Sequence, residues 1–330
     1  MSTVDGAGIG LVLEDFVFDH GDDQANGQVF KITGIKSTAA SPEDVEITVS
    51  QLYIARADSN YGENLNPVNL GRLVNPFQID VIDGATLGIG NKAVLEMAAP
   101  TKVPFAEGYD CLSSSATAGS GTCSSRPMDL GAGFNGERPD LGLKLGVAVG
   151  SKTPHNVNIN AKSAVFDGSY LRLWGDDDRH QLVAEYKLNF YTPELSINSC
   201  DPSGQNCGST IYMKNFELEL ALGNRFQPMY MDVNGDGNFV FEVKAIAHQY
   251  MNQLPSSGKC DAGNPCSANA QAAYDFFKSY YENDEFRSNL RIGNMTIGDI
   301  NASGKDFGSA RIEGMLIQYL KVTSHDLAAP

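Results

Sequence analysis

Apolar and polar residues alternate with a period of two from one end of this sequence to the other. The alternation is clearest over 141–149, 157–161, 182–190, 216–222 and 239–245. A period of two is that of an extended strand, whose side chains point alternately to two faces. A strand with one apolar and one polar face is typical of an antiparallel sheet that packs one side on a core. Further strands are expected over 28–37, 44–56, 77–83, 87–97, 289–300 and 310–323.

Only one segment has the period of a helix. Between 267 and 282, alanines and aromatic residues recur at helical spacing behind Pro265 and Cys266. The sequence therefore predicts an all-β fold, mainly antiparallel, built as a sandwich or an elongated stack of sheets. One helix is inserted near 267–282.

A Ser/Gly-rich stretch over 106–140 is the candidate boundary between structural units. A loop of that length is uncommon inside a compact domain, so it is either a linker or an elaborated surface loop. We expect an N-terminal β region over 1–105 and a C-terminal β region with the inserted helix over 141–330. The apolar fraction of 42% is sufficient for a core in one large or two smaller domains.

The charge balance excludes two classes of partner. The 330 residues contain 40 acidic and 24 basic side chains, for a net charge of −16. Nucleic acid and anionic membrane surfaces both require a positive field, so neither is expected as a partner. No stretch approaches the ~20 apolar residues of a transmembrane helix. The first 30 residues carry no export signal, so we expect a mature product or an internal start.

Six cysteines indicate the compartment. They fall into three neighbouring pairs, Cys111–Cys123, Cys200–Cys207 and Cys260–Cys266. Pairing neighbours closes short loops, which costs the least entropy, and none of the spacings fits a zinc site. We therefore expect three local disulfides, with free thiols as the alternative. Disulfides persist in oxidising compartments, which predicts a secreted or cell-surface protein.

One acidic segment has the pattern of half a calcium loop. Oxygen-bearing residues stand at positions 1, 3 and 5, a glycine at position 6 and a carbonyl at position 7. Position 12 is Val243, and strands are expected on both flanks, which differs from an EF-hand. The hypothesis is a structural calcium ion; the alternative is a hairpin turn without metal. The candidate ligands are Asp232, Asn234, Asp236, Asn238 and Glu242.

Catalytic motifs are scarce. The five histidines are scattered, and neither a zinc-hydrolase spacing nor a Gly-x-Ser-x-Gly nucleophile motif occurs. Ser256 and Lys259 have Ser-x-x-Lys spacing but lie in a Pro/Gly-rich turn with no helix to orient them. We therefore predict a protein that is not an enzyme and has no catalytic or cofactor-binding residues. A secreted β-sandwich hydrolase with carboxylates distant in sequence is the third alternative.

The N-terminal segment 8–18 carries large apolar residues at both parities. Leu11 and Leu13 share one parity, and Phe16 and Phe18 share the other. This pattern predicts a strand covered on both faces. Either it is a central strand of its own domain, or it is a donor strand that completes the sheet of the next subunit. Donor strands build fibres from incomplete domains.

The opening Met-Ser-Thr-Val-Asp-Gly-Ala-Gly-Ile-Gly-Leu resembles the mature start of certain Gram-negative surface proteins. Some of those proteins are assigned to pilus assembly or to filament operons. The stretches 291–298 and 307–314 are similar to their closing strands. The resemblance covers about a tenth of the chain. It implies an exported, surface-associated β protein, and it carries over no catalytic residue.

The sequence as a whole predicts a structural subunit of an extracellular filament. Self-assembly would proceed by exchange of the strand at 8–18, with roles in adhesion and biofilm. The alternative is a calcium-dependent secreted adhesin or carbohydrate-binding module with surface glycans as its partners.

Overall fold

A computed structural model describes most of the chain. The described residues are 8–20, 30–37, 41–56, 62, 64–71, 76–100, 138–152, 155–177, 179–201, 207–245, 251–253, 259–263, 265–298 and 304–324. The strands of the first third are β1 (Ile9–Leu11), β2 (Leu13–Phe16), β3 (Phe18–His20), β4 (Phe30–Lys36), β5 (Asp44–Arg56), β6 (Val68–Leu70), β7 (Phe77–Asp83) and β8 (Ala93–Ala98).

The remaining strands follow the stretch 101–137. They are β9 (Pro139–Val149), β10 (His155–Lys162), β11 (Tyr170–Asp176), β12 (Gln181–Cys200), β13 (Cys207–Leu222), β14 (Met229–Val233), β15 (Phe239–Val243), β16 (Ser288–Ile297), β17 (Lys305–Met315) and β18 (Leu320–Thr323). The helix is α2 (Ala268–Tyr281), with short 3₁₀ turns at Gly84–Leu87, Met251–Gln253 and Asp284–Phe286. The predicted all-β antiparallel fold with one inserted helix is confirmed.

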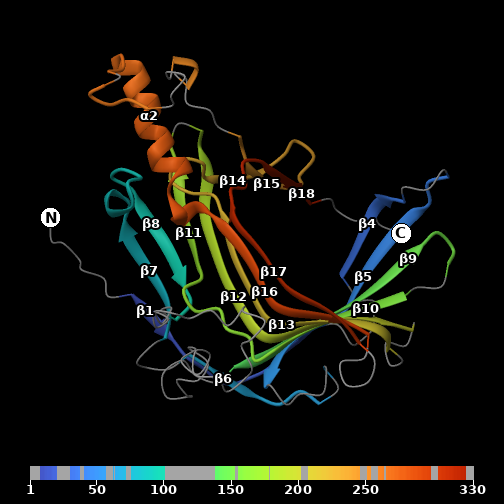
Figure 1. The fold of residues 1–330 in the computed structure, drawn as a ribbon. Coiled ribbons are helices and arrows are strands. Elements are labelled where there is room, and N and C mark those ends of the chain that lie inside the picture. Colours follow the sequence, from blue (N-terminus) through green and yellow to red (C-terminus); the bar gives the residue numbers. More distant parts are fainter. Residues whose placement is uncertain are drawn as a thin grey trace.

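The long strand β12 is the spine of the sheet, and four groups of strands extend from it (Figure 1). On one edge, its first half pairs with β11 and its second half with β10. On the other edge, the first residues pair with β14 and the rest with β13. We name the four groups the β7 wing (β11, β8, β7), the β5 wing (β10, β9, β5, with β4), the β18 wing (β14, β15, β18) and the β17 wing (β13, β16, β17).

The apolar positions change parity along one line that crosses three neighbouring strands. In β12 they are even-numbered up to Phe190 and odd-numbered from Leu195; the same change falls at Asn215 in β13 and Gly293 in β16. Asn215 adopts a left-handed φ of 52°, which interrupts the alternation of side chains. A Cβ on Gly293 would lie 2.9 Å from the Cβ of Asn215, so glycine permits this approach. On each side of this line, we call the face of the sheet that carries the alternating apolar residues the apolar side, and the opposite face the polar side.

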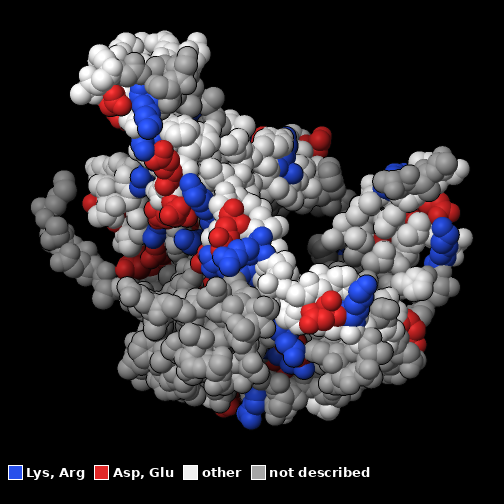
Figure 2. Space-filling model, viewed as in Figure 1, with Lys and Arg blue, Asp and Glu red and all other residues white. Residues whose placement is uncertain are grey.

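Many of the buried residues lie on the opposite, polar side of the sheet. Val94, Trp174 and Val183 form a small cluster there, packed against the 3₁₀ turn after β7. In the β5 wing, Tyr53 and Asn160 are at most 3% exposed and share a hydrogen bond of 3.2 Å. Figure 2 shows acidic and basic side chains interleaved over the β7 and β17 wings on the face toward the viewer.

Helix α2 is fixed to the sheet at its C-terminal end. Ser267 caps its N-terminus by accepting a hydrogen bond from the Ala270 amide. The buried Tyr280 hydroxyl donates to the Gln227 side chain, whose amide nitrogen donates in turn to two backbone carbonyls, those of Lys244 and Gln318. The helix therefore ties the β18 wing to the rest of the molecule.

The two predicted β regions share one sheet. Residues of the N-terminal third pair with later ones at two places, β5 with β9 and β8 with β11. The predicted loop or linker over 106–140 lies almost wholly outside the described residues.

Candidate assembly surface

The N-terminal segment Ile9–His20, which we call the strap, closes the sheet into a ring. Its first part, β1, pairs with β7 at one end of the sheet, and its last part, β3, pairs with β5 at the other end. Between them, β2 pairs with β6. The two ends of the path of paired strands therefore belong to one twelve-residue segment (Figure 1).

Small residues and side-chain hydrogen bonds hold the strap in place. A Cβ on Gly8 would lie 2.9 Å from the Asp80 side chain, so the strap can approach β7 this closely only without one. The Asp15 amide donates to Asn69 at 2.9 Å, and the Gln51 side chain donates to Asp19 at 3.1 Å. These contacts anchor the strap in its middle and at its C-terminal end.

The strap contains a bulge that the alternation of its residues did not predict. Leu13 pairs with Leu70 and Phe16 with Val68, so the register shifts by one residue at Glu14–Asp15. Asp15 has a left-handed φ of 50°. This bulge places Leu13 and Phe16, which have opposite parity, on the same face of the strap. Val12 and Val17 occupy alternate positions, so large apolar residues remain at both parities.

The apolar side chains of the strap are poorly covered. Ile9 is 60% exposed, and Leu11, Leu13 and Phe18 are each about 40% exposed. Phe16 is half-buried against Val68, whose side chain is 1% exposed. The four predicted assembly residues therefore lie on one segment that pairs within its own chain, with three of them open to solvent.

The sheet also has free edges among the described strands. Strand β17 pairs only with β16, and ten of its eleven residues are exposed. Phe307 and Ile312, both on β17, are each 51% exposed. A long edge with unpaired backbone groups and exposed apolar residues is a template for pairing with another chain.

The predicted calcium loop is the turn of the β14–β15 hairpin. The Asn234 side-chain oxygen accepts hydrogen bonds from the amides of Asp236 and Asn238, at 3.0 and 2.9 Å. Asp232 accepts from the Gln181 side chain. Glu242 lies on β15 and forms an ion pair with Lys244 at 3.5 Å. Hydrogen-bond donors of the protein therefore contact three of the five predicted calcium ligands. Calcium binding at this turn stays a prediction.

Two of the predicted disulfides are present. Cys200–Cys207 joins the end of β12 to the start of β13, and Cys260–Cys266 lies just before α2. Cys111–Cys123 lies outside the described residues. Disulfides are compatible with a secreted or extracellular protein.

Two carboxylates lie on the polar side where the β7 wing meets β12: Glu185 is buried and Glu96 is partly buried. Arg172 bonds Glu96 at 2.6 Å and lies 3.6 Å from Glu185, which accepts from the Tyr170 hydroxyl at 2.9 Å. Burial raises the pKa of Glu185, and burial beside that carboxylate raises the pKa of Tyr170. One guanidinium engages both carboxylates, which is the arrangement of a structural ion-pair network across three strands.

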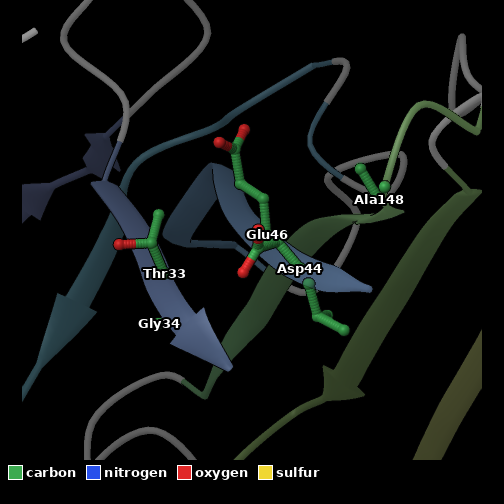
Figure 3. A pocket seen from close by; sticks show the side chains of 7 residues that line it. Thr33, Gly34, Asp44, Glu46 and Ala148 are labelled. Atoms are coloured by element: carbon green, nitrogen blue, oxygen red, sulfur yellow. The ribbon is translucent and has the colours of Figure 1, made fainter. Parts of the chain in front are cut away.

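A shallow pocket of about 250 Å³ lies at the end of the β5 wing (Figure 3). Its walls include Thr33 and Gly34, where β4 bulges away from β5, and two carboxylates, Asp44 and Glu46. Lysines already pair with both carboxylates, Lys36 with Asp44 and Lys31 with Glu46. No sequence motif pointed to this pocket.

Comparison with models of protein families, with curated proteins and with solved structures finds no match to this chain. Among the described residues, none of the helices is long and apolar enough to cross a membrane. The functional argument therefore depends on the geometry of the chain itself.

Proposed function

We propose that this protein is a structural subunit of an extracellular filament, in which the strap of one copy closes the ring of the next copy. The observation that carries the proposal is the position of the strap. It closes the sheet from both ends, by pairing with β7 and with β5. An element of this kind can leave its own ring and close an identical one.

The pairing of the strap is weak compared with the rest of the sheet. It contributes three residue pairs with β7, two with β6 and three with β5, whereas β12 and β13 share thirteen. The same contacts would form with a strap from another copy, so exchange costs little in contact energy. Head-to-tail exchange does not close on itself and therefore produces a fibre.

Two further observations support this function. The disulfides fit an oxidising extracellular compartment, where surface filaments assemble. The opening residues, which lead directly into the strap, resemble the mature start of Gram-negative proteins of pilus assembly and filament operons.

Cysteine pairs across the strap provide the test. In Ile9→Cys/Ile79→Cys, the new thiols stand directly opposite each other on β1 and β7, within reach of a disulfide. If the strap is exchanged, oxidation of assembled protein joins different chains and gives a ladder on a non-reducing gel. Oxidation of dilute monomer before assembly should instead join the two cysteines within one chain and prevent filament growth.

A second pair and a control complete the design. Phe18→Cys/Ile54→Cys tests the other end of the strap, at β3 and β5. Gln78→Cys/Ala98→Cys joins β7 to β8, which stay in one chain under any exchange of the strap, and should give monomers only. Filaments of the two strap variants that run as monomers after oxidation would contradict the proposal.

A further inference from the structure

A row of apolar side chains crosses four strands at the top of the molecule and is open to solvent. Leu182 on β12 stands opposite Met231 on β14, which stands opposite Phe241 on β15, which stands opposite Val322 on β18. Directly opposed residues point to the same face of a sheet, so these four form one surface. Leu182, Phe241 and Val322 are 45%, 38% and 50% exposed.

A second row extends this surface toward the hairpin turn. Val233 and Phe239 oppose each other two residues further along, on the same face, and are 51% and 62% exposed. We name these six residues the β18 patch. None of the six is charged; Asp232, Glu242 and Lys321 occupy alternate positions and point to the opposite face.

The other face of the same strands is already occupied. Tyr230, one residue from Met231, packs against the cluster of Val94, Trp174 and Val183. At the far end of the hairpin, Val243 continues the face of the β18 patch and is 1% exposed. The apolar face is therefore buried at Val243 and exposed toward the turn, and among the described residues no second layer covers the β18 patch.

We infer that the β18 patch binds the β18 patch of a second copy, face to face. The role of this contact, as a lateral contact between strands of subunits, rests on the proposed filament. Its geometry is independent of the strap. Two sheets that present apolar faces pack about 10 Å apart and form a shared core. A patch that pairs with itself gives a closed two-fold contact, distinct from the open contact of strand exchange.

The area of the patch agrees with this occupant. Phe239 and Phe241, 62% and 38% exposed, together expose about the area of one aromatic side chain, ~150–250 Å². With the four smaller residues, of which Met231 is partly buried, the patch offers at most roughly 500 Å² per copy, or about 1,000 Å² for two. A total of about 1,000 Å² is near the lower limit for a specific interface between two proteins. An area of about 500 Å² per copy is near the upper limit for an apolar patch on a monomer. Figure 2 shows a hollow between the β18 wing and the β5 wing.

The net charge opposes an anionic lipid surface as the occupant. At −16 the chain is repelled by such a surface at long range, and the patch contributes no cation to offset this. Two copies also repel each other, but apolar contact acts at short range and salt screens the repulsion. The proposed dimer should therefore tighten as salt increases.

The test uses the full chain with its strap locked by the Ile9→Cys/Ile79→Cys disulfide, so that strand exchange cannot contribute. Sedimentation velocity over a concentration series should detect a dimer. Val322→Ser and Phe239→Ser should each weaken this dimer at least about tenfold. Lys321→Ser, which changes the neighbouring side chain on the opposite face of β18, is the matched control and should leave the dimer unchanged.

The outcomes separate this inference from the proposed function. A locked chain that stays monomeric at all concentrations and salt levels overturns the lateral contact, whether or not the unlocked protein forms filaments by exchange. A dimer that Val322→Ser and Phe239→Ser leave intact also overturns it. Flotation with neutral phosphatidylcholine vesicles, lost in Val322→Ser while no dimer forms, would assign the patch to lipid instead.

Discussion

The β5 wing and the β18 wing are built from similar alternating strands, yet they differ in which side is buried. In the β5 wing the polar side is the covered one, with Tyr53 at 1% and Asn160 at 3% exposure, while Leu52 on the apolar side is 39% exposed. In the β18 wing the apolar side is buried only at Val243 and open at Phe239. Burial here depends on where a second layer lies, and hydrophobicity alone does not determine it.

The buried polar residues of the β5 wing fit closely against the residues opposite them. Tyr53 stands opposite Gly142, and its ring occupies the space where a side chain would be. Asn158 and Gln51 are also buried on this side. Substitutions on this side of the β5 wing should lower stability, because a displaced polar group loses its hydrogen bonds in a place without water.

The largest expected effect is at Gly142. A Cβ at this position would lie 1.8 Å from Cε1 of Tyr53, which is buried and bonded to Asn160. Gly142→Ala should therefore lower the free energy of unfolding by about 3 kcal/mol or more, measured by chemical denaturation. Tyr53→Leu in the same chain should recover part of the loss. Gly175→Ala, where nothing lies within 4 Å, is the control and should change stability by less than about 0.5 kcal/mol; equal effects would contradict the close fit.

The second prediction compares the two ends of the apolar side in the β18 wing. Val243→Ala should cost about 2–3 kcal/mol because its side chain is buried. Val322→Ala, with a side chain 50% exposed, should change the stability of the monomer by less than about 0.5 kcal/mol. Thermal denaturation at a concentration too low for association measures both. A similar cost at the two positions would mean that the patch is already covered within one chain.

The third prediction concerns pH and Asp167, in the segment between β10 and β11. Burial raises the pKa of its carboxyl group to about 6, and Arg138 lowers it in part. The folded state therefore holds this proton more tightly than the unfolded state, so stability from this group is present at low pH and is lost as pH rises from about 4 to 6. Asp167→Asn should raise stability at pH 7 by about 2 kcal/mol and flatten this slope. An unchanged pH profile of unfolding would contradict the shift.

The smallest expected effect is in the β14–β15 turn. Asn234→Ala removes an oxygen that accepts two amide hydrogen bonds and should cost about 1 kcal/mol. If calcium binds, chelation should lower the melting temperature of the wild-type protein, and Asp236→Ala should abolish that difference. Melting curves that coincide with and without chelator would leave the turn without a metal.

Local patterns in the sequence predicted the elements well. The strand expected over 44–56 is β5 with the same bounds, and the helix expected over 267–282 is α2, one residue shorter at each end. Helical and strand periodicity are properties of neighbouring residues, which explains this agreement. The split of the segment 310–323 into the end of β17 and a separate β18 was not predicted.

The candidate site was less predictable, for two physical reasons. The bulge at Asp15 depends on a left-handed residue that a tertiary contact with Asn69 supports, so parity alone did not predict that Leu13 and Phe16 share a face. Closure of the ring depends on pairing with β5 and β7, which the strap's own residues do not specify. A change of apolar parity beside Asp or Asn, as at Asp15 and Asn215, is the signal that could have indicated a left-handed residue in a strand.

The partners of the strap also determine when it can form during synthesis. All three lie between residues 52 and 79, so the strap can find β5, β6 and β7 before the spine of the sheet has been made. Short loops close faster than long ones, and contacts between residues near in sequence form early. A newly made chain would therefore protect its own strap first, and exchange with another copy would come later, after the edges of β5 and β7 are exposed again.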